Sequence, residues 1–435
     1  MGAKRRKVSI LALIILVYLV LGVIYATQTP KWEVPDEPAH YNYVKSLAES
    51  HRFPVLEVGD YPHEYLEEIK AAKFPDHMSI DPIRYESHQP PLYYLLAAPI
   101  YRLTLSLSLR AQVVVLRLLS LAFGGGLLVV CYLTVKDVFP GDEVLALATT
   151  GLVATIPMHI AMSAAINNDT LAELILALIL LVLVKLQKEG LTRQRGMALG
   201  LLLGLGLLTK STTYLAFPLV LLAVFTSEGY RRDSAVRLIA VSFGLALAIS
   251  WWWFLRNLLI YGSFDIFGWR RHDAIVVGQP RTGSFDLAAA KHFLSVSFKS
   301  FWAQFGWMGI LVDERIYLTL FLVSALAGLG FLLFVSKNLL HRDLLSHHQK
   351  VSLSLLGSAF LLVFASDLGY NLKFIQAQGR YLFPAIVPIC LFFVMGLREL
   401  MKREYEKLFF SLMYWGFLAL DIVCLWGFIV PYFRN

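Results

Sequence analysis

The sequence predicts an all-α protein that crosses the membrane many times. Apolar residues form long runs, such as residues 8–25 and 171–186, near the length that the hydrocarbon core of a bilayer requires. Hydrophobic residues make up 57% of the 435 residues and charged residues only 16%, against about a quarter in soluble proteins. The mean hydropathy of +0.62 agrees with this pattern. We therefore expect a single transmembrane domain over residues 1–435.

The first predicted span covers residues 8–27 and follows a basic cluster at residues 4–7. A basic segment before an apolar run is also typical of a secretory signal peptide. The run is long for such a peptide, and residues 25–28 contain no clean cleavage site with small residues. We interpret the segment as an uncleaved membrane helix.

Runs of about 20 apolar residues predict about eleven spans. The fifth and sixth are short and meet at Lys210. The predicted spans lie near residues 8–27, 112–135, 144–162, 170–187, 196–209, 212–227, 235–255, 316–336, 351–369, 381–398 and 408–430.

Basic residues between the spans predict the orientation. Lysine and arginine concentrate in the cytoplasmic connections of membrane proteins. With a cytoplasmic N-terminus and strict alternation, every inside connection after the second span carries basic residues, and the weakest has only Lys136. The net charge of +8 therefore reflects orientation and does not indicate a nucleic-acid partner. We expect a multi-pass protein of the plasma (inner) membrane.

Two long segments are predicted to lie outside the cytoplasm, over residues 28–110 and 256–315. Within the first, residues 28–88 hold twelve acidic residues against six basic ones, and the second is rich in aromatic residues. A helix is expected over residues 36–49. Another, over residues 91–109, has mixed polarity and is predicted to lie on the membrane surface.

Asp36 and Glu37 follow directly after the first span, between two prolines. Adjacent carboxylates at a membrane boundary are costly unless they are solvated or used. They also suit a helix N-terminus, where acidic residues interact favourably with the helix dipole. Both interpretations remain open from the sequence.

Two further polar groups lie on the same predicted side. His88 and Gln89 precede a proline pair at the end of the acidic segment, either as site residues or as an ordinary start of a helix. Asn168 and Asp169 stand at the turn between the third and fourth spans, where they can also cap the fourth helix.

Cations on the outer side are unexpected from orientation alone. Lys210 lies between two short apolar segments, Arg256 follows a run of tryptophans, and Arg380-Tyr381 opens the tenth span. Intramembrane cations mark a functional site by default, and arginine presents a fork suited to phosphate, although Lys210 can also snorkel to the interface.

The predicted outer face thus combines carboxylates with cations. A carboxylate can take a proton from an attacking hydroxyl, and cations can hold a phosphate as it leaves. This combination suits the transfer of a group from a phosphate-bearing lipid to an acceptor outside the cytoplasm.

At these residues the sequence resembles the GT-C superfamily of membrane glycosyltransferases, and in particular the branch of protein O-mannosyltransferases and the aminoarabinose transferase of lipid A. The resemblance covers most of the chain, in family order. It rests on the acidic pair at 36–37, the His-Gln-Pro-Pro-Leu element at 88–92, the Asn-Asp turn at 168–169, the Leu-Thr-Lys element at 208–210, and the Arg-Tyr-Leu-Phe-Pro element at 380–384.

The resemblance implies a GT-C fold and an inverting glycosyltransferase that uses a polyprenyl-phosphate-linked sugar, with a glycan, lipid or protein as acceptor. Asp36 would be the general base, and Glu37 would assist or position it. No cofactor is required by the resemblance, although some members use a divalent metal, for which Asp36 with Asp169 is a possible site. By the same resemblance, the lipid phosphate would be held by Lys210, Arg256 and Arg380. The sugar or acceptor pocket would be lined by His88, Gln89, Asn168 and Asp169. Tyr381 would be a further substrate-binding residue.

Two other functions remain open. A transporter or flippase of a lipid-linked sugar would place polar residues inside the spans, as with Glu173 and Asp421. A non-catalytic relative would bind a lipid phosphate within a larger assembly.

Overall fold

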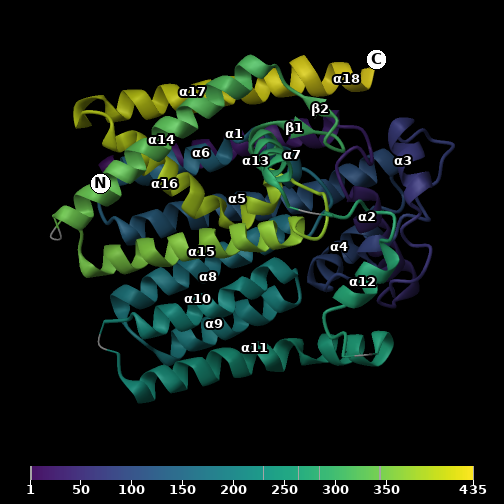
Figure 1. Cartoon of the computed structure of the whole chain (residues 1–435), viewed down its shortest axis with the longest axis horizontal. Helices are drawn as coiled ribbons and strands as arrows, with labels where there is room; N and C mark the ends of the chain where they lie inside the picture. The colour runs from purple at the N-terminus through teal and green to yellow at the C-terminus, as the bar shows by residue number, and fades with distance from the viewer. Residues whose placement is uncertain (1, 229, 263, 284, 342–343, 435) are drawn as a thin grey trace.

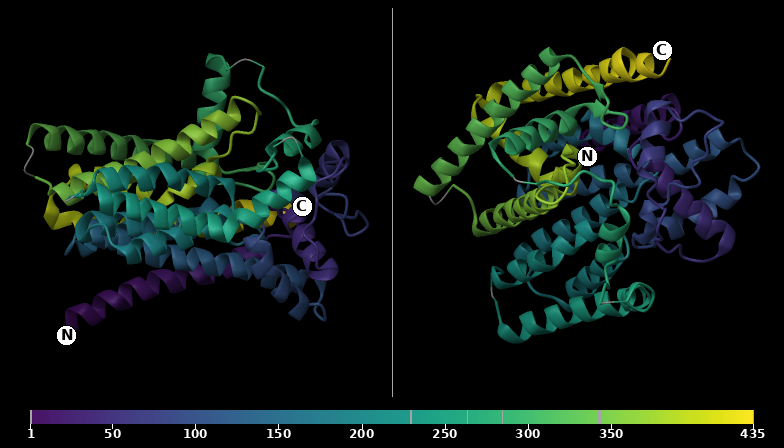
Figure 2. Two further views of the ribbon diagram at one scale, coloured as in Figure 1. Left: turned by 90° about the horizontal axis from the view of Figure 1, so that it is seen from below. Right: turned by 45° about the vertical axis from the view of Figure 1, so that its right-hand side comes forward.

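The computed structural model describes residues 2–228, 230–262, 264–283, 285–341 and 344–434. The long helices lie side by side in one bundle, and the two ends of the chain lie at opposite ends of it (Figures 1 and 2). The fold is all-α, as predicted, apart from two short paired strands, β1 (Gln304–Phe305) and β2 (Ile310–Leu311).

Within the described residues, seven helical segments are long and apolar enough to cross a membrane, or eight if one bent pair forms a single span. Each of the eleven ranges expected from the sequence falls on a helix or a broken helix, and the count of eleven spans stays a prediction. The bundle consists of α1 (Gly2–Gln28), α5 (Leu109–Val138), α6 (Glu143–Ala154), α7 (Pro157–Ser163), α8 (Asp169–Glu189), α9 (Arg193–Leu207), α10 (Ala216–Phe225), α11 (Arg232–Tyr261), α14 (Glu314–Leu340), α15 (His347–Asn371), α16 (Ile386–Glu399) and α17 (Glu406–Val423).

Several helices break before they reach the end of the bundle that carries the long outer segments. Pro157 opens α7, which bends by 65° from α6 because proline cannot continue the backbone hydrogen bonds of a helix. The 3-10 turns η2 (Ser211–Leu215) and η3 (Gly379–Ala385) precede α10 and α16, while η4 (Arg403–Tyr405), the π-helical turn η5 (Cys424–Ile429) and α18 (Val430–Arg434) flank α17. Irregular backbone at membrane depth persists where protein buries it or where it lines a cavity.

The two segments predicted to lie outside pack against each other at one end of the bundle (Figure 2). The Arg271 side chain donates to the Leu56 carbonyl, and the Leu56 amide donates to the Tyr261 hydroxyl. The helix expected over 36–49 spans Glu37–Ser50, whereas the helix expected over 91–109 is shorter and spans Leu92–Leu103. These segments contain α2 (Glu37–Ser50), α3 (His63–Ala71), η1 (Tyr85–His88), α4 (Leu92–Leu103), α12 (Trp269–Ile275) and α13 (Leu287–Trp302).

One close approach fixes η3 against α13. A Cβ added at Gly379 would lie 2.2 Å from the Ser297 carbonyl oxygen and from the Phe301 amide nitrogen. The Gly379 amide instead donates to the Ser300 hydroxyl at 2.7 Å. This contact needs a glycine, and it sets the position of the next residue, Arg380.

Candidate functional site

Asp36 lies where the first outer segment turns into α2. Its backbone is left-handed, with φ of 66°, a conformation that aspartate tolerates better than most residues. Both carboxylate oxygens accept hydrogen bonds: Oδ1 from the Tyr85 hydroxyl at 2.7 Å and Oδ2 from the Arg380 guanidinium at 2.5 Å. The side chain is 19% exposed and lines a cavity.

Glu37 points away from that cavity. Its carboxylate forms a fully buried ion pair with Arg117 of α5, at 2.6 and 2.7 Å, and also accepts from the backbone amides of Trp32 and Ile166. Arg117 in turn donates to carbonyl groups at the end of α1 and just beyond it. Of the two roles expected for Glu37, this arrangement favours positioning of the turn over direct assistance.

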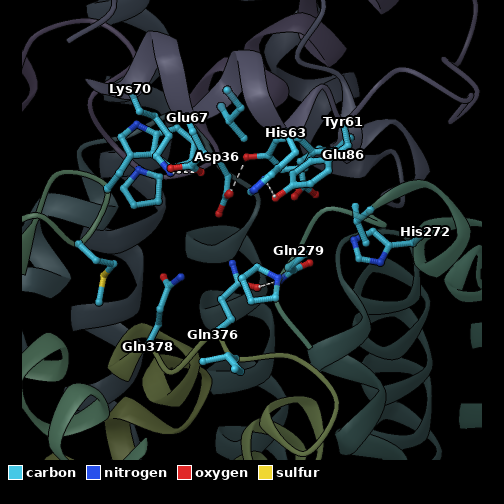
Figure 3. A pocket seen from close by; sticks show the side chains of 18 of the residues that line it. Asp36, Tyr61, His63, Glu67, Lys70, Glu86, His272, Gln279, Gln376 and Gln378 are labelled. Atoms are coloured by element: carbon cyan, nitrogen blue, oxygen red, sulfur yellow. Dashed lines mark hydrogen bonds and ion pairs between the residues drawn. The ribbon is translucent and has the colours of Figure 1, made fainter. Parts of the chain in front are cut away.

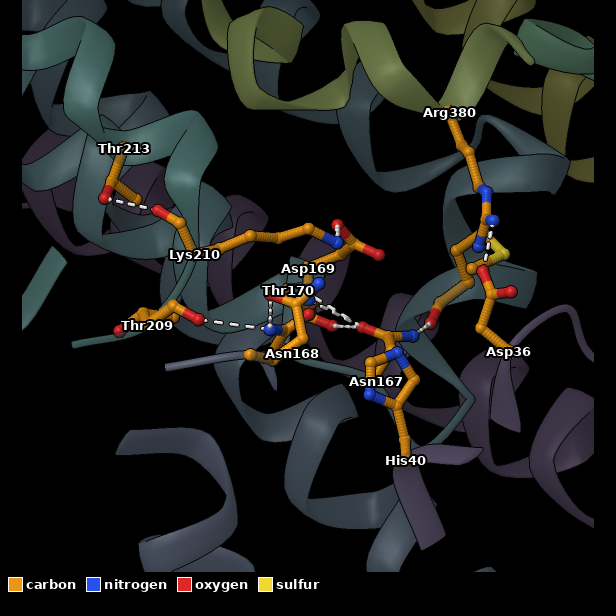
Figure 4. Close-up of polar contacts among 12 residues, drawn as sticks. Asp36, His40, Asn167, Asn168, Asp169, Thr170, Thr209, Lys210, Thr213 and Arg380 are labelled. Carbon is orange, nitrogen blue, oxygen red and sulfur yellow. Dashed lines mark hydrogen bonds and ion pairs between the residues drawn. The ribbon is translucent and has the colours of Figure 1, made fainter. Parts of the chain in front are cut away.

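Lys210 and Asp169 form a second ion pair, at 2.5 Å, beside the first (Figure 4). Asn167, and not Asn168, caps α8 through hydrogen bonds to the amides of residues 169 and 170. The Asp169 carboxylate is therefore free of the capping role and faces the lysine, which the break between α9 and η2 carries into the site.

The two ion pairs lie close enough to act on each other. Burial raises the pKa of the Asp36 carboxyl, but Arg380 outweighs this effect, so the pKa is lowered to about 2. For Asp169, burial likewise raises the pKa, and Lys210 and Arg380 together leave it lowered. Both groups are ionised at neutral pH, and Arg380 stabilises both.

His40, which the sequence did not single out, lies between the two pairs (Figure 4). Its Nδ1 atom is 2.8 Å from the Tyr94 hydroxyl. Burial lowers the pKa of His40, and the nearby carboxylates do not reverse this effect, so the ring is neutral at pH 7.

His88 and Gln89 form the wall behind the site and do not line the cavity. The His88 ring contacts the Tyr85 carbonyl at 3.0 Å and packs against His272, and burial lowers its pKa to about 3. The Gln89 side chain accepts from the Asn168 amide, which also donates to the Thr209 carbonyl beside Lys210.

Arg256 does not join the other cations, contrary to expectation. Its guanidinium donates to the carbonyls of Phe53 and Pro54 and lies over the Trp253 ring. It also donates to the Asn257 side chain, and it therefore anchors the first outer segment to α11. These contacts do not favour the role expected for Arg256 at the lipid phosphate, which stays a prediction.

A cavity of about 470 Å³ opens in front of Asp36 (Figure 3). The labelled residues of the first outer segment lie on one side, and Gln279, Gln376 and Gln378 face them from the other. Tyr381 also lines it, with the Arg380 guanidinium over its ring. The lining comes from six separate segments, residues 35–36, 61–70, 85–86, 272–280, 307–308 and 370–381. Apart from Asp36 and Tyr381, sequence reasoning predicted none of these lining residues as site residues, although some stand beside predicted ones. The unpredicted lining residues include Tyr61, Tyr85, Glu86, His272, Trp307 and Tyr370.

The residues present do not form a complete metal site around Asp36 and Asp169. Each carboxylate already faces a cation, Arg380 or Lys210. Across the described ranges, no group of three or more His, Cys, Asp or Glu residues is arranged to hold a metal ion. We therefore derive no step through a metal.

Comparison with known proteins agrees with the architecture. The model of the dolichyl-phosphate-mannose-protein mannosyltransferase family matches residues 88–254. No curated protein matches the sequence significantly.

Solved structures share the fold at low sequence identity. ArnT from Cupriavidus metallidurans, solved with undecaprenyl phosphate, is 14% identical, with a TM-score of 0.56 over 97% of this chain and 73% of its own. The Archaeoglobus fulgidus oligosaccharyltransferase, solved with zinc and sulfate, is 13% identical, with a TM-score of 0.51 over 95% of this chain and 52% of its own. The chain thus spans about half the length of the archaeal enzyme. The family match over residues 88–254 and the shared fold agree with the resemblance to GT-C membrane glycosyltransferases that the sequence predicts.

Proposed function

We propose that the protein is an inverting glycosyltransferase that moves a sugar from a polyprenyl-phosphate-linked donor to an acceptor hydroxyl on the non-cytoplasmic side. One observation carries the proposal: Asp36 stands between a cavity and a pair of cations, Arg380 and Lys210. A base next to an open space and cations behind it are what such a transfer needs. The family match over residues 88–254 and the undecaprenyl phosphate bound in the ArnT structure support the donor class.

In the proposed reaction, Arg380 and Lys210 bind the phosphate of the donor, and the acceptor hydroxyl approaches from the cavity. The acceptor oxygen forms a bond to the anomeric carbon as the bond from that carbon to the phosphate oxygen breaks. The hydroxyl proton passes to Asp36, and the negative charge that develops on the leaving phosphate is neutralised by the two cations. A single displacement of this kind inverts the anomeric configuration.

The Asp36–Arg380 ion pair determines the order of donor binding and base activation in this mechanism. With both its oxygens occupied and its pKa lowered to about 2, Asp36 is a weak base before the donor binds. A donor phosphate competes for the Arg380 guanidinium, which frees a carboxylate oxygen for the acceptor hydroxyl. Donor binding therefore precedes activation of the base.

The proposal also includes the side of the membrane that the site faces and the membrane in which the protein lies. The two outer segments lie at the end of the bundle opposite the N-terminus (Figure 2). The N-terminal segment and the predicted inner connections carry clusters of basic residues, such as residues 4–7, 185–195 and 398–407. By the positive-inside rule, this orientation directs the cavity out of the cytoplasm, in the plasma (inner) membrane.

The test uses purified protein in proteoliposomes with radiolabelled hexoses and pentoses on undecaprenyl or dolichyl phosphate. A new glycosidic bond, with inverted anomeric configuration and release of the lipid phosphate, supports the proposal. Movement of a donor across the bilayer without any new bond would instead make the protein a flippase.

A further inference from the structure

Glu86 differs from the other carboxylates of the site. Asp36, Asp169 and Glu37 each pair with a basic side chain. The Oε2 atom of Glu86 is shielded from solvent, yet it has no hydrogen-bond partner among the described residues. Leaving a buried carboxylate oxygen unpaired costs free energy, unless a ligand supplies the missing donor.

The carboxylate lies within the candidate site and not behind it. Glu86 lines the same cavity as Asp36, and Figure 3 shows both on the same side of it. Glu86 also acts electrostatically on His40, where it opposes the effect of burial on the pKa of that ring. A group that binds to Glu86 is therefore held near the proposed base.

Besides the Glu67–Lys70 ion pair and two histidines, the cavity wall combines aromatic rings with side-chain amides. The Tyr370 hydroxyl donates to the Gln376 amide oxygen at 2.9 Å, and the Gln279 amide donates to that hydroxyl at 3.3 Å. Amides and hydroxyls in such a network offer both donors and acceptors to a ligand. The aromatic members of the wall are Tyr61, Tyr85, Trp307, Tyr370 and Tyr381.

This composition matches the chemistry of a sugar ring, which presents several hydroxyl groups at its edge and C–H bonds on its faces. Hydroxyl groups donate to a carboxylate and exchange hydrogen bonds with amides, while the faces pack on aromatic rings. A peptide that binds by adding a strand to a sheet edge is a poorer match. Near this cavity the described residues form only the two-residue strands β1 and β2 and a single bridge between Arg281 and Phe374.

We propose that the cavity in front of Asp36 takes a sugar residue of the acceptor, and that Glu86 holds it by accepting hydrogen bonds from its hydroxyl groups. The acceptor is thus a carbohydrate, free or as part of a larger glycan or glycolipid. This inference rests on the proposed function, since it names the acceptor class of the same site.

The experiment measures binding directly. The full chain in detergent is titrated, by saturation-transfer NMR, with a panel of methyl pyranosides and disaccharides, and separately with serine- and threonine-containing peptides. Saccharide binding by the wild type and a loss of affinity of about tenfold or more in Glu86→Gln are expected. Glu68→Gln serves as the control, because Glu68 is an exposed acid on α3 that does not line the cavity.

A second readout separates recognition from a structural effect. In the transfer assay, Glu86→Gln raises the KM for the acceptor and leaves the KM for the donor and the unfolding temperature near the wild-type values. Peptide binding in place of saccharide binding, or saccharide binding unchanged in Glu86→Gln, would overturn the inference. Saccharide binding that depends on Glu86, without transfer from any polyprenyl-phosphate donor, would refute the proposed function and leave the carbohydrate subsite intact.

Discussion

The Asp36 carboxylate accepts a hydrogen bond from the Arg380 guanidinium, although 344 positions separate the two residues in the chain. Asp36 comes from the first outer segment and Arg380 from the turn that opens α16. Gly379 brings η3 against α13, and the Glu37–Arg117 pair holds the turn that carries Asp36. The geometry of the proposed base therefore depends on two distant packing contacts, each of which a substitution can break.

Gly379→Ala tests the first of these contacts. The added Cβ would overlap backbone atoms of α13, so η3 must shift and Arg380 moves with it. We expect transfer to fall by on the order of 100-fold, the cost of misplacing a catalytic group by about 1 Å. Gly369→Ala is the matched control, since a Cβ at this α15 position meets no atom within 4 Å. Equal activity of the two variants would argue against the packing role of Gly379.

Glu37→Gln tests the second contact. Removing one charge of a buried pair leaves Arg117 uncompensated, at a cost of about 3–5 kcal/mol in the free energy of unfolding. Thermal unfolding in detergent should show a large loss for this variant and a smaller one for Asp36→Asn. A fully stable Glu37→Gln protein with no activity would instead place Glu37 in the chemistry.

Lys210→Met tests the phosphate site while keeping much of the volume of the side chain. We expect the Kd for an undecaprenyl-phosphate sugar to rise about tenfold or more, because a charge-assisted contact is lost. Lys185→Met is the control, since Lys185 lies near the opposite end of the bundle, at the end of α8, and pairs with Asp137. Unchanged donor affinity in Lys210→Met would remove Lys210 from the phosphate site.

The lowered pKa of Asp36 predicts a specific dependence of stability on pH. Because the pKa falls from 3.8 to about 2 on folding, the ionised carboxylate stabilises the protein at pH values above 3.8, by about 2 kcal/mol. This contribution is lost as the pH falls through about 2. Unfolding measurements should therefore show the largest difference between wild type and Asp36→Asn above pH 4, with a decline towards pH 2. A difference that grows on acidification would contradict the assigned direction.

The sequence predicted that four charged residues lie at the same end of the bundle, because membrane orientation does not explain charges there. These residues are Asp36, Asp169, Lys210 and Arg380. The sequence could not predict which way a side chain points around its helix, and so it could not reveal that Arg256 contacts the carbonyls of Phe53 and Pro54. Helix periodicity also cannot reveal pairing between distant segments, which determines the surroundings of Arg117 and Glu86. The number of spans was hard to count for a related reason, since α6–α7 and α9–η2–α10 break within apolar stretches.

Single-turnover sugar transfer by Asp36→Asn tests the central proposal most directly. Asparagine tolerates the left-handed backbone and keeps the size of the side chain, but it cannot take up the proton of the acceptor hydroxyl. With saturating donor, the account predicts that transfer falls by about 100-fold or more, whereas Asp76→Asn, at an exposed acid of the same outer segment, transfers normally. Transfer at the wild-type rate by Asp36→Asn would show that Asp36 is not the base.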